Sequence, residues 1–232
     1  MKSIIMEKQA ATEAAAKQVK ELIDRKPNAV LAMAGGRTTM GLYRKLAEMN
    51  RKGEINFEDV SIFLAADFET APAGKYIKDP FIADFIDRIA INDMNVYYIN
   101  SMNWNIYDEV IEKKGGLDLV ILGLGANCHI GFNEPATPFQ SLSHRQRITD
   151  ATKRQYADMF GGEDKVPAYG YTIGIKTIYE ARSHMLLAFG EEKAEPVFNM
   201  FYGRNDSRYP AAFLQVPPEV NVYMDEAAAA KL

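Results

Sequence analysis

The hydrophobic residues of this 232-residue chain follow two patterns that alternate along the sequence. Short continuous apolar runs are typical of strands buried on both faces, as in a parallel sheet. They occupy residues 29–33, 60–65, 96–99, 117–122 and 184–189. Apolar residues at helical spacing lie before or between these runs, in residues 6–25, 40–49, 79–91 and 103–114. The alternation predicts an α/β fold with three layers: a Rossmann-like, mostly parallel sheet with helices on both faces.

The C-terminal half continues the pattern with shorter elements. We predict strands at residues 169–175, 211–215 and 221–224, a short helix at 177–182, and a further helix that opens at residue 191. Residues 136–153 form a polar segment without such a pattern, and residues 71–78 read as a loop. No Pro-rich or Gly-rich linker divides the sequence, so we expect one domain over residues 1–232.

The strand predicted at residues 117–122 is followed by an abrupt change to polar side chains. Gly123 and Gly125 end the apolar run, and His129 and Glu134 follow within eleven residues. Ligands of open parallel sheets bind beyond the carboxyl ends of the strands, where such a pair serves acid–base chemistry. A polar loop that only satisfies its own backbone groups explains the same spacing about equally well.

A second candidate loop follows the strand at residues 29–33. It contains Gly35, Gly36, Arg37 and Thr38 and leads directly into a predicted helix. A strand, a glycine loop and a helix form the arrangement that binds phosphate, because main-chain N–H groups and the helix dipole both face the anion. A purely structural turn with a helix cap remains the equal alternative.

Composition limits the classes of partner. The chain is 47% hydrophobic and 25% charged, with a net charge of −4, and nothing in it indicates a nucleic-acid or membrane surface. A single cysteine, Cys128, excludes an internal disulfide and fits a cytoplasmic protein. With three scattered histidines and no Cys/His cluster, we expect neither a metal site nor a cofactor.

The run Gly-Leu-Gly-Ala-Asn-Cys-His-Ile-Gly-Phe-Asn-Glu-Pro, residues 123–135, closely resembles the signature loop of glucosamine-6-phosphate deaminases and galactosamine-6-phosphate isomerases. The superfamily also contains 6-phosphogluconolactonases, but the run that ends in Glu134-Pro135 favours the deaminase branch. The resemblance extends over most of the chain. It implies conversion of a hexosamine 6-phosphate to a ketose 6-phosphate and ammonia. The sequence is also compatible with assembly of the protein into a homo-oligomer.

The resemblance also assigns roles to individual residues. His129 opens the sugar ring, Glu134 orients and charge-stabilises this histidine, and Asn127 stands where family members carry Asp or Asn. The substrate phosphate is held by the glycine loop and by a lysine that opens a later helix. In this sequence these are Gly35, Gly36, Arg37, Thr38 and Lys193.

Four positions depart from the family pattern, and one of them is Thr39, where proline is common. Alignment of the strand at residues 60–65 puts Ala66 at the position of the general base and Asp67 at the acid that follows. Either Asp67 acts as the base, or the chain is a sugar-phosphate-binding protein that has lost turnover; a 6-phosphogluconolactonase-like hydrolase is the third alternative. Arg37 inside the glycine loop and Cys128 in place of glycine are the other two departures.

Overall fold

The structure is a computed structural model that describes residues 1–70, 74 and 76–232, so residues 71–73 and 75 of the predicted loop lie outside it. Its centre is a seven-stranded sheet with the order β1-β10-β9-β6-β2-β3-β5, in which the described strands pair in parallel. The strands are β1 (Lys2–Ile5), β2 (Val30–Met33), β3 (Ser61–Leu64), β5 (Val96–Tyr97), β6 (Leu119–Gly123), β9 (His184–Ala188) and β10 (Val220–Met224). The predicted parallel α/β fold is confirmed.

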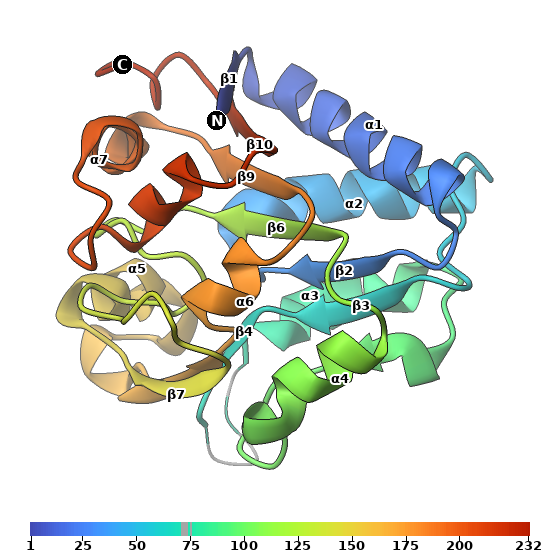
Figure 1. Cartoon of the computed structure of the whole chain (residues 1–232), viewed down its shortest axis with the longest axis horizontal. Coiled ribbons are helices and arrows are strands. Elements are labelled where there is room, and N and C mark those ends of the chain that lie inside the picture. Colours follow the sequence, from blue (N-terminus) through green and yellow to red (C-terminus); the bar gives the residue numbers. More distant parts are fainter. Residues whose placement is uncertain (71–73, 75) are drawn as a thin grey trace.

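Helices cover both faces of this sheet (Figure 1). On one face α1 (Lys8–Arg25), α2 (Arg37–Arg51) and α3 (Lys78–Asp84) bury their apolar sides against the strands. On the other face lie α4 (Tyr107–Lys113), α6 (Ile175–Tyr179) and α7 (Ala194–Tyr202). An apolar core lies on each face of the sheet. The four residues of β2 are all buried, and alternate residues point into the cores on opposite faces.

A second, antiparallel sheet lies beside the first and was not predicted as such. It contains β4 (Ala66–Phe68), β8 (Tyr169–Thr172) and β7 (His144–Arg147), in the order β4-β8-β7. The predicted polar segment 136–153 supplies β7 and the beginning of α5 (Asp150–Phe160). Phe68 of β4 packs against Tyr156 and Phe160 of α5, with both ring pairs 5.1 Å apart, so the helix covers the small sheet.

Several predicted elements need correction. The strand predicted at residues 169–175 ends at Thr172, and the short helix predicted at 177–182 is α6, which begins at Ile175. Residues 211–215 are not a strand but part of a 3₁₀ helix, η6 (Pro210–Gln215), because Pro210 fixes a helical φ at its first turn. The helix predicted over residues 79–91 ends at Asp84 and gives way to the 3₁₀ turn η1 (Ile86–Arg88). The remaining 3₁₀ turns are η2 (Asp93–Asn95), η3 (Trp104–Ile106), η4 (Glu163–Lys165) and η5 (Glu191–Lys193). No helix of the described chain is both long enough and apolar enough to cross a membrane.

The strand order brings the two candidate loops together. From β2 the chain adds β3 and β5 on one side, whereas β6, β9 and β10 lie on the other. β2 and β6 are therefore neighbours at the point where the direction of winding changes, the usual ligand site of such sheets. The N–H of Ala34 donates to the carbonyl of Ile121 at 2.9 Å, which holds the two strand ends side by side.

Candidate active site

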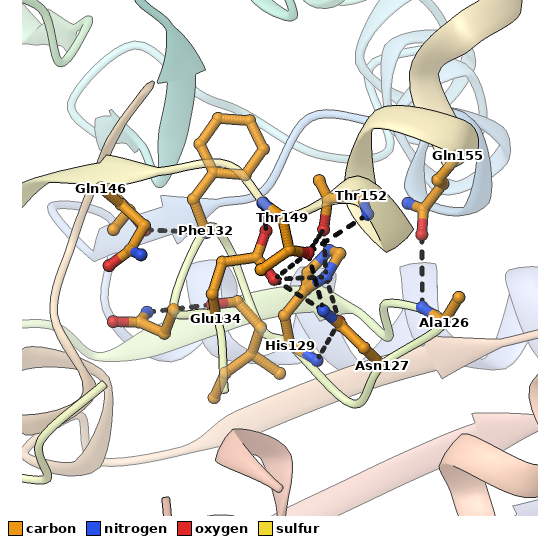
Figure 2. A network of polar contacts seen from close by, with 12 residues as sticks. Ala126, Asn127, His129, Phe132, Glu134, Gln146, Thr149, Thr152 and Gln155 are labelled. Atoms are coloured by element: carbon orange, nitrogen blue, oxygen red, sulfur yellow. Dashed lines mark hydrogen bonds and ion pairs between the residues drawn. The ribbon is translucent and has the colours of Figure 1, made fainter. Parts of the chain in front are cut away.

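His129 is the centre of a buried polar network just beyond β6 (Figure 2). Its side chain is 5% exposed. The Nδ1 atom lies 2.7 Å from Oδ1 of Asn127 and 3.1 Å from the hydroxyl of Thr152. Gly125 makes room for the ring, because a Cβ atom at this position would overlap the imidazole. The glycine that ends the strand is thus a requirement for the position of the histidine.

The hydrogen-bond partners of Asn127 determine which nitrogen of the His129 imidazole carries the proton. Nδ2 of Asn127 donates to Oε2 of Glu134 at 2.7 Å, since a carboxylate only accepts. The amide oxygen of Asn127 therefore faces His129, and Nδ1 of the histidine must carry the proton that it accepts. The lone pair then resides on Nε2, to which no described residue donates a hydrogen bond. The arrangement prepares Nε2 as a proton acceptor.

Glu134 is fixed by the first turn of α5. The N–H of Thr149 donates to Oε1 at 3.2 Å, and the Thr149 hydroxyl donates to Oε2 at 3.1 Å. Glu134 has a side-chain exposure of 1% and lies 3.8 Å from Nδ1 of His129. Burial lowers the pKa of His129; the charge of Glu134 opposes this, and that of Lys193 adds to it. The imidazole is consequently neutral at neutral pH.

The glycine loop between β2 and α2 forms the next wall. Gly36 is the N-cap of α2 with φ +132°, a conformation that favours glycine, and no side chain caps this helix. The first-turn N–H groups of a helix have no acceptor within it. Thr38 faces the end of β6, 3.8 Å from where a Cβ of Gly123 would lie. The loop can therefore hold an anion beside the histidine.

The two predicted phosphate-binding cations differ in environment. Lys193, at the end of η5, is 6% exposed, and no described side chain accepts a hydrogen bond from its ammonium group. Burial lowers the pKa of Lys193, and the charge of Arg37 lowers it further against the opposing effect of Glu192. Arg37 has a side-chain exposure of 79% and points to α5, 3.8 Å from Asp158. Lys193 is thus a buried cation with no ion-pair contact to a carboxylate of the described residues; the charge of Glu192 acts on it from farther away.

Asp67 and Ala66 lie on opposite faces of β4. Ala66 belongs to an apolar cluster with Phe68, Ile77 and Phe132. Asp67 is 1% exposed; its Oδ1 accepts from the N–H groups of Phe68 at 2.9 Å and Ile77 at 2.8 Å. Its Oδ2 has no hydrogen-bond partner among the described residues and lies 3.9 Å from the ammonium of Lys78.

Desolvation raises the pKa of Asp67 to about 7, although the two N–H groups and Lys78 oppose the rise. Ile77, which holds Oδ1, packs directly against Gly35. Ile77 therefore connects the carboxyl group to the glycine loop, and a pKa of about 7 is that of a group able to accept a proton near neutral pH.

Cys128 is a structural residue. Its φ is +67°, which is unusual for a residue other than glycine. The residue is 1% exposed, and its thiol donates to the carbonyl of Pro196 at 3.4 Å. Burial raises the pKa of the Cys128 thiol to about 12. The thiolate needed for nucleophilic attack is thus not formed at neutral pH. In the described part of the chain, no three His, Cys, Asp or Glu side chains are arranged to hold a metal ion.

The site includes residues that sequence reasoning missed. Thr149, Thr152, Gln155 and Tyr156 all come from the beginning and first turns of α5, and they face His129, Glu134 or the glycine loop. Their spacing of three, three and one places them on one side of a helix. Thr149 as N-cap was the available signal, but the polar segment showed no apolar periodicity to announce the helix.

Fold and site together define an α/β protein with a buried network of His129, Asn127 and Glu134 next to a glycine loop at the switch point of a parallel sheet. The family model of glucosamine-6-phosphate isomerases/6-phosphogluconolactonase matches residues 6–223, and the chain belongs to this family. The resemblance noted from residues 123–135 is confirmed.

Relatives cover nearly the whole chain. The glucosamine-6-phosphate deaminase of Clostridium botulinum (strain Eklund 17B / Type B) is 34% identical over 95% of this chain and 92% of its own length. That of Mycoplasma mycoides subsp. mycoides SC is 33% identical over 100% of this chain and 98% of its own. The solved structure of a monomeric glucosamine-6-phosphate deaminase superposes with a TM-score of 0.95 at 27% identity, with both chains fully covered. A 6-phosphogluconolactonase from Thermotoga maritima has the same fold, with a TM-score of 0.75 at 20% identity over 97% of this chain and 99% of its own.

Proposed function

We propose that this protein converts a hexosamine 6-phosphate to a ketose 6-phosphate and ammonia. The observation that carries the proposal is the juxtaposition of a neutral, oriented His129 with a glycine loop and a buried, unpaired Lys193. Relatives with about one third of their residues identical to this chain are named glucosamine-6-phosphate deaminases. The site supplies what their substrate needs: an anion pocket and a proton acceptor next to it.

The first step is binding and ring opening. The phosphate lies at Gly35, Gly36 and Thr38, where N–H groups at the start of α2 and the Lys193 ammonium neutralise it. Nε2 of His129 takes the proton of the hydroxyl at C1 and passes it to the ring oxygen as the bond between C1 and that oxygen breaks, so that C1 becomes an aldehyde. Asn127 and Glu134 stabilise the imidazolium formed.

The second step moves a proton between carbons 1 and 2. Oδ2 of Asp67 takes the proton from C2 and returns it at C1, while a proton moves from the amino nitrogen to the oxygen on C1, which leaves an imine at C2. Water adds to this imine, and ammonia departs. A carboxyl group with a pKa of about 7 suits this exchange, since it both accepts and releases a proton near neutral pH.

Ammonia release from glucosamine 6-phosphate and galactosamine 6-phosphate tests the proposal. We expect one or both to yield ammonia, and expect Asp67→Asn to lower the rate by about 10²–10⁴-fold, the usual contribution of a general base. A control is Asp158→Asn on α5, where the carboxylate is 93% exposed. Wild-type protein that releases no ammonia from either sugar would refute turnover.

One observation favours a second function, that of a sugar-phosphate-binding protein without turnover. Ala66, which aligns with the family's base, contributes only a methyl group to an apolar cluster. Under this alternative both sugar phosphates raise the melting temperature while neither releases ammonia. Recovery of ammonia release in Ala66→Asp would then identify the missing carboxylate as the cause.

A further inference from the structure

The side of α5 that faces the site makes contact with both of its loops. The beginning of the helix meets the catalytic loop: Thr149 bonds to Glu134, and Thr152 lies 3.1 Å from His129. One turn later Gln155 accepts from the N–H of Ala126 at 3.3 Å (Figure 2). The carbonyl of Gln155 also accepts from Arg37 at 3.5 Å. The helix is thus attached to both loops and forms a wall across them.

Tyr156 is the residue of this wall that faces the glycine loop. Its hydroxyl oxygen lies 3.6 Å from the position that a Cβ of Gly36 would occupy. Its ring is held edge-on by Phe68, with centroids 5.1 Å apart, and by Phe132, at 6.2 Å. Two aromatic neighbours fix the direction of the ring and so the place of the hydroxyl.

We propose that Tyr156 is a further substrate-binding residue, whose hydroxyl donates a hydrogen bond to the phosphate held at the glycine loop. This rests on the proposed function, because it assumes the anion at Gly36. Space for an anion is available there because Gly36 lacks a side chain. The Tyr156 hydroxyl lies 3.6 Å from the position of the missing Cβ, so it is the group of α5 that an anion in this space would meet first. A hydroxyl serves this purpose because it donates to an oxyanion without itself being charged.

The charges around Tyr156 support a donor rather than an anion. Burial, with smaller contributions from the charges of Glu134 and Asp67, raises the pKa of its hydroxyl to about 12, against the opposing effects of Arg37 and of a hydrogen bond with Gln155. The proton therefore remains on the hydroxyl throughout the neutral range. The contact adds a neutral donor, which does not add to the repulsion between the charges of Lys193 and Arg37.

Calorimetric titration of Tyr156→Phe with inorganic phosphate and with fructose 6-phosphate tests the assignment. The variant keeps the ring and its aromatic contacts and removes only the hydroxyl. We expect the Kd for both ligands to rise by roughly tenfold, as for one hydrogen bond to a charged acceptor. The matched control is Tyr202→Phe, the same change on an exposed ring of α7, for which both Kd values should equal those of wild type.

The outcomes separate this proposal from the function on which it rests. If wild type binds both ligands and Tyr156→Phe binds them equally well, the role of Tyr156 is refuted and the function stands. If only fructose 6-phosphate is weakened, the hydroxyl contacts the sugar and the assignment to phosphate is wrong. If wild type binds neither ligand, the phosphate site itself and the proposed function both fail.

Discussion

Replacement of Asp67 by asparagine should stabilise the protein at high pH while removing its activity. Folding raises the pKa of Asp67 from 3.8 to about 7. The folded state therefore favours the protonated carboxyl, and the stability that this provides is complete below pH 3.8 and is lost as the pH rises to 7. At about 1.4 kcal/mol per unit, the three units correspond to about 4 kcal/mol.

Asparagine cannot ionise, so the stability of Asp67→Asn does not decrease in this way as the pH rises. Its amide oxygen still accepts from the N–H groups of Phe68 and Ile77, which now bond to Oδ1. Its Nδ2 occupies the place of Oδ2, which has no hydrogen-bond partner among the described residues, and an unpaired buried donor costs about 1–3 kcal/mol. The net gain at pH 8 is therefore about 1–3 kcal/mol, and the same variant is less stable than wild type near pH 4.

Urea unfolding of both proteins at several pH values between 4 and 8 measures this difference. The free energy of unfolding of the variant minus that of wild type should increase by about 4 kcal/mol over this range. The exposed Asp158→Asn should show no comparable change. A difference for Asp67→Asn that stays constant with pH would mean that Asp67 ionises normally in the folded protein and is not a base that titrates near neutral pH.

The loop that carries His129 can be tested at Gly125, Asn127 and Cys128. Gly125→Ala should abolish ammonia release, because the added methyl group would overlap the imidazole of His129. The control is Gly41→Ala, whose methyl group would meet no atom closer than 4.0 Å; it should leave activity unchanged and stabilise α2 by about 0.5–1 kcal/mol. Equal activity of these two variants would refute the packing argument. In Asn127→Asp a carboxylate replaces the neutral amide beside His129 and should raise the pKa of the imidazole, as measured by NMR; an unchanged or lower value would contradict the network. Cys128 should react with a thiol reagent only in denaturant, since it is buried with a pKa of about 12, and rapid labelling of the folded protein would show that this loop opens.

Local sequence was sufficient where a residue type has few structural alternatives. The continuous apolar runs predicted the buried parallel strands, because only a sheet covered on both faces accepts apolar side chains at every position. Residues 123–135 likewise indicated the family, since a glycine-lined turn with a histidine and a carboxylate is a rare chemical pattern. The type of a short element was less secure: residues 211–215, predicted as a strand, belong to a 3₁₀ helix that begins at Pro210.

The tertiary structure decided which distant residues meet. Nothing in the sequence around residue 67 announces that Oδ2 of Asp67 lacks a partner, since this depends on Ile77 and on the burial supplied by the rest of the fold. The same holds for α5, whose polar side carries no apolar signal and becomes part of the site only through contacts with His129, Glu134 and Arg37. Sequence patterns report how each segment buries its own apolar surface, whereas desolvation and charge at one point sum over segments that are far apart in the chain, and only the folded arrangement sets them.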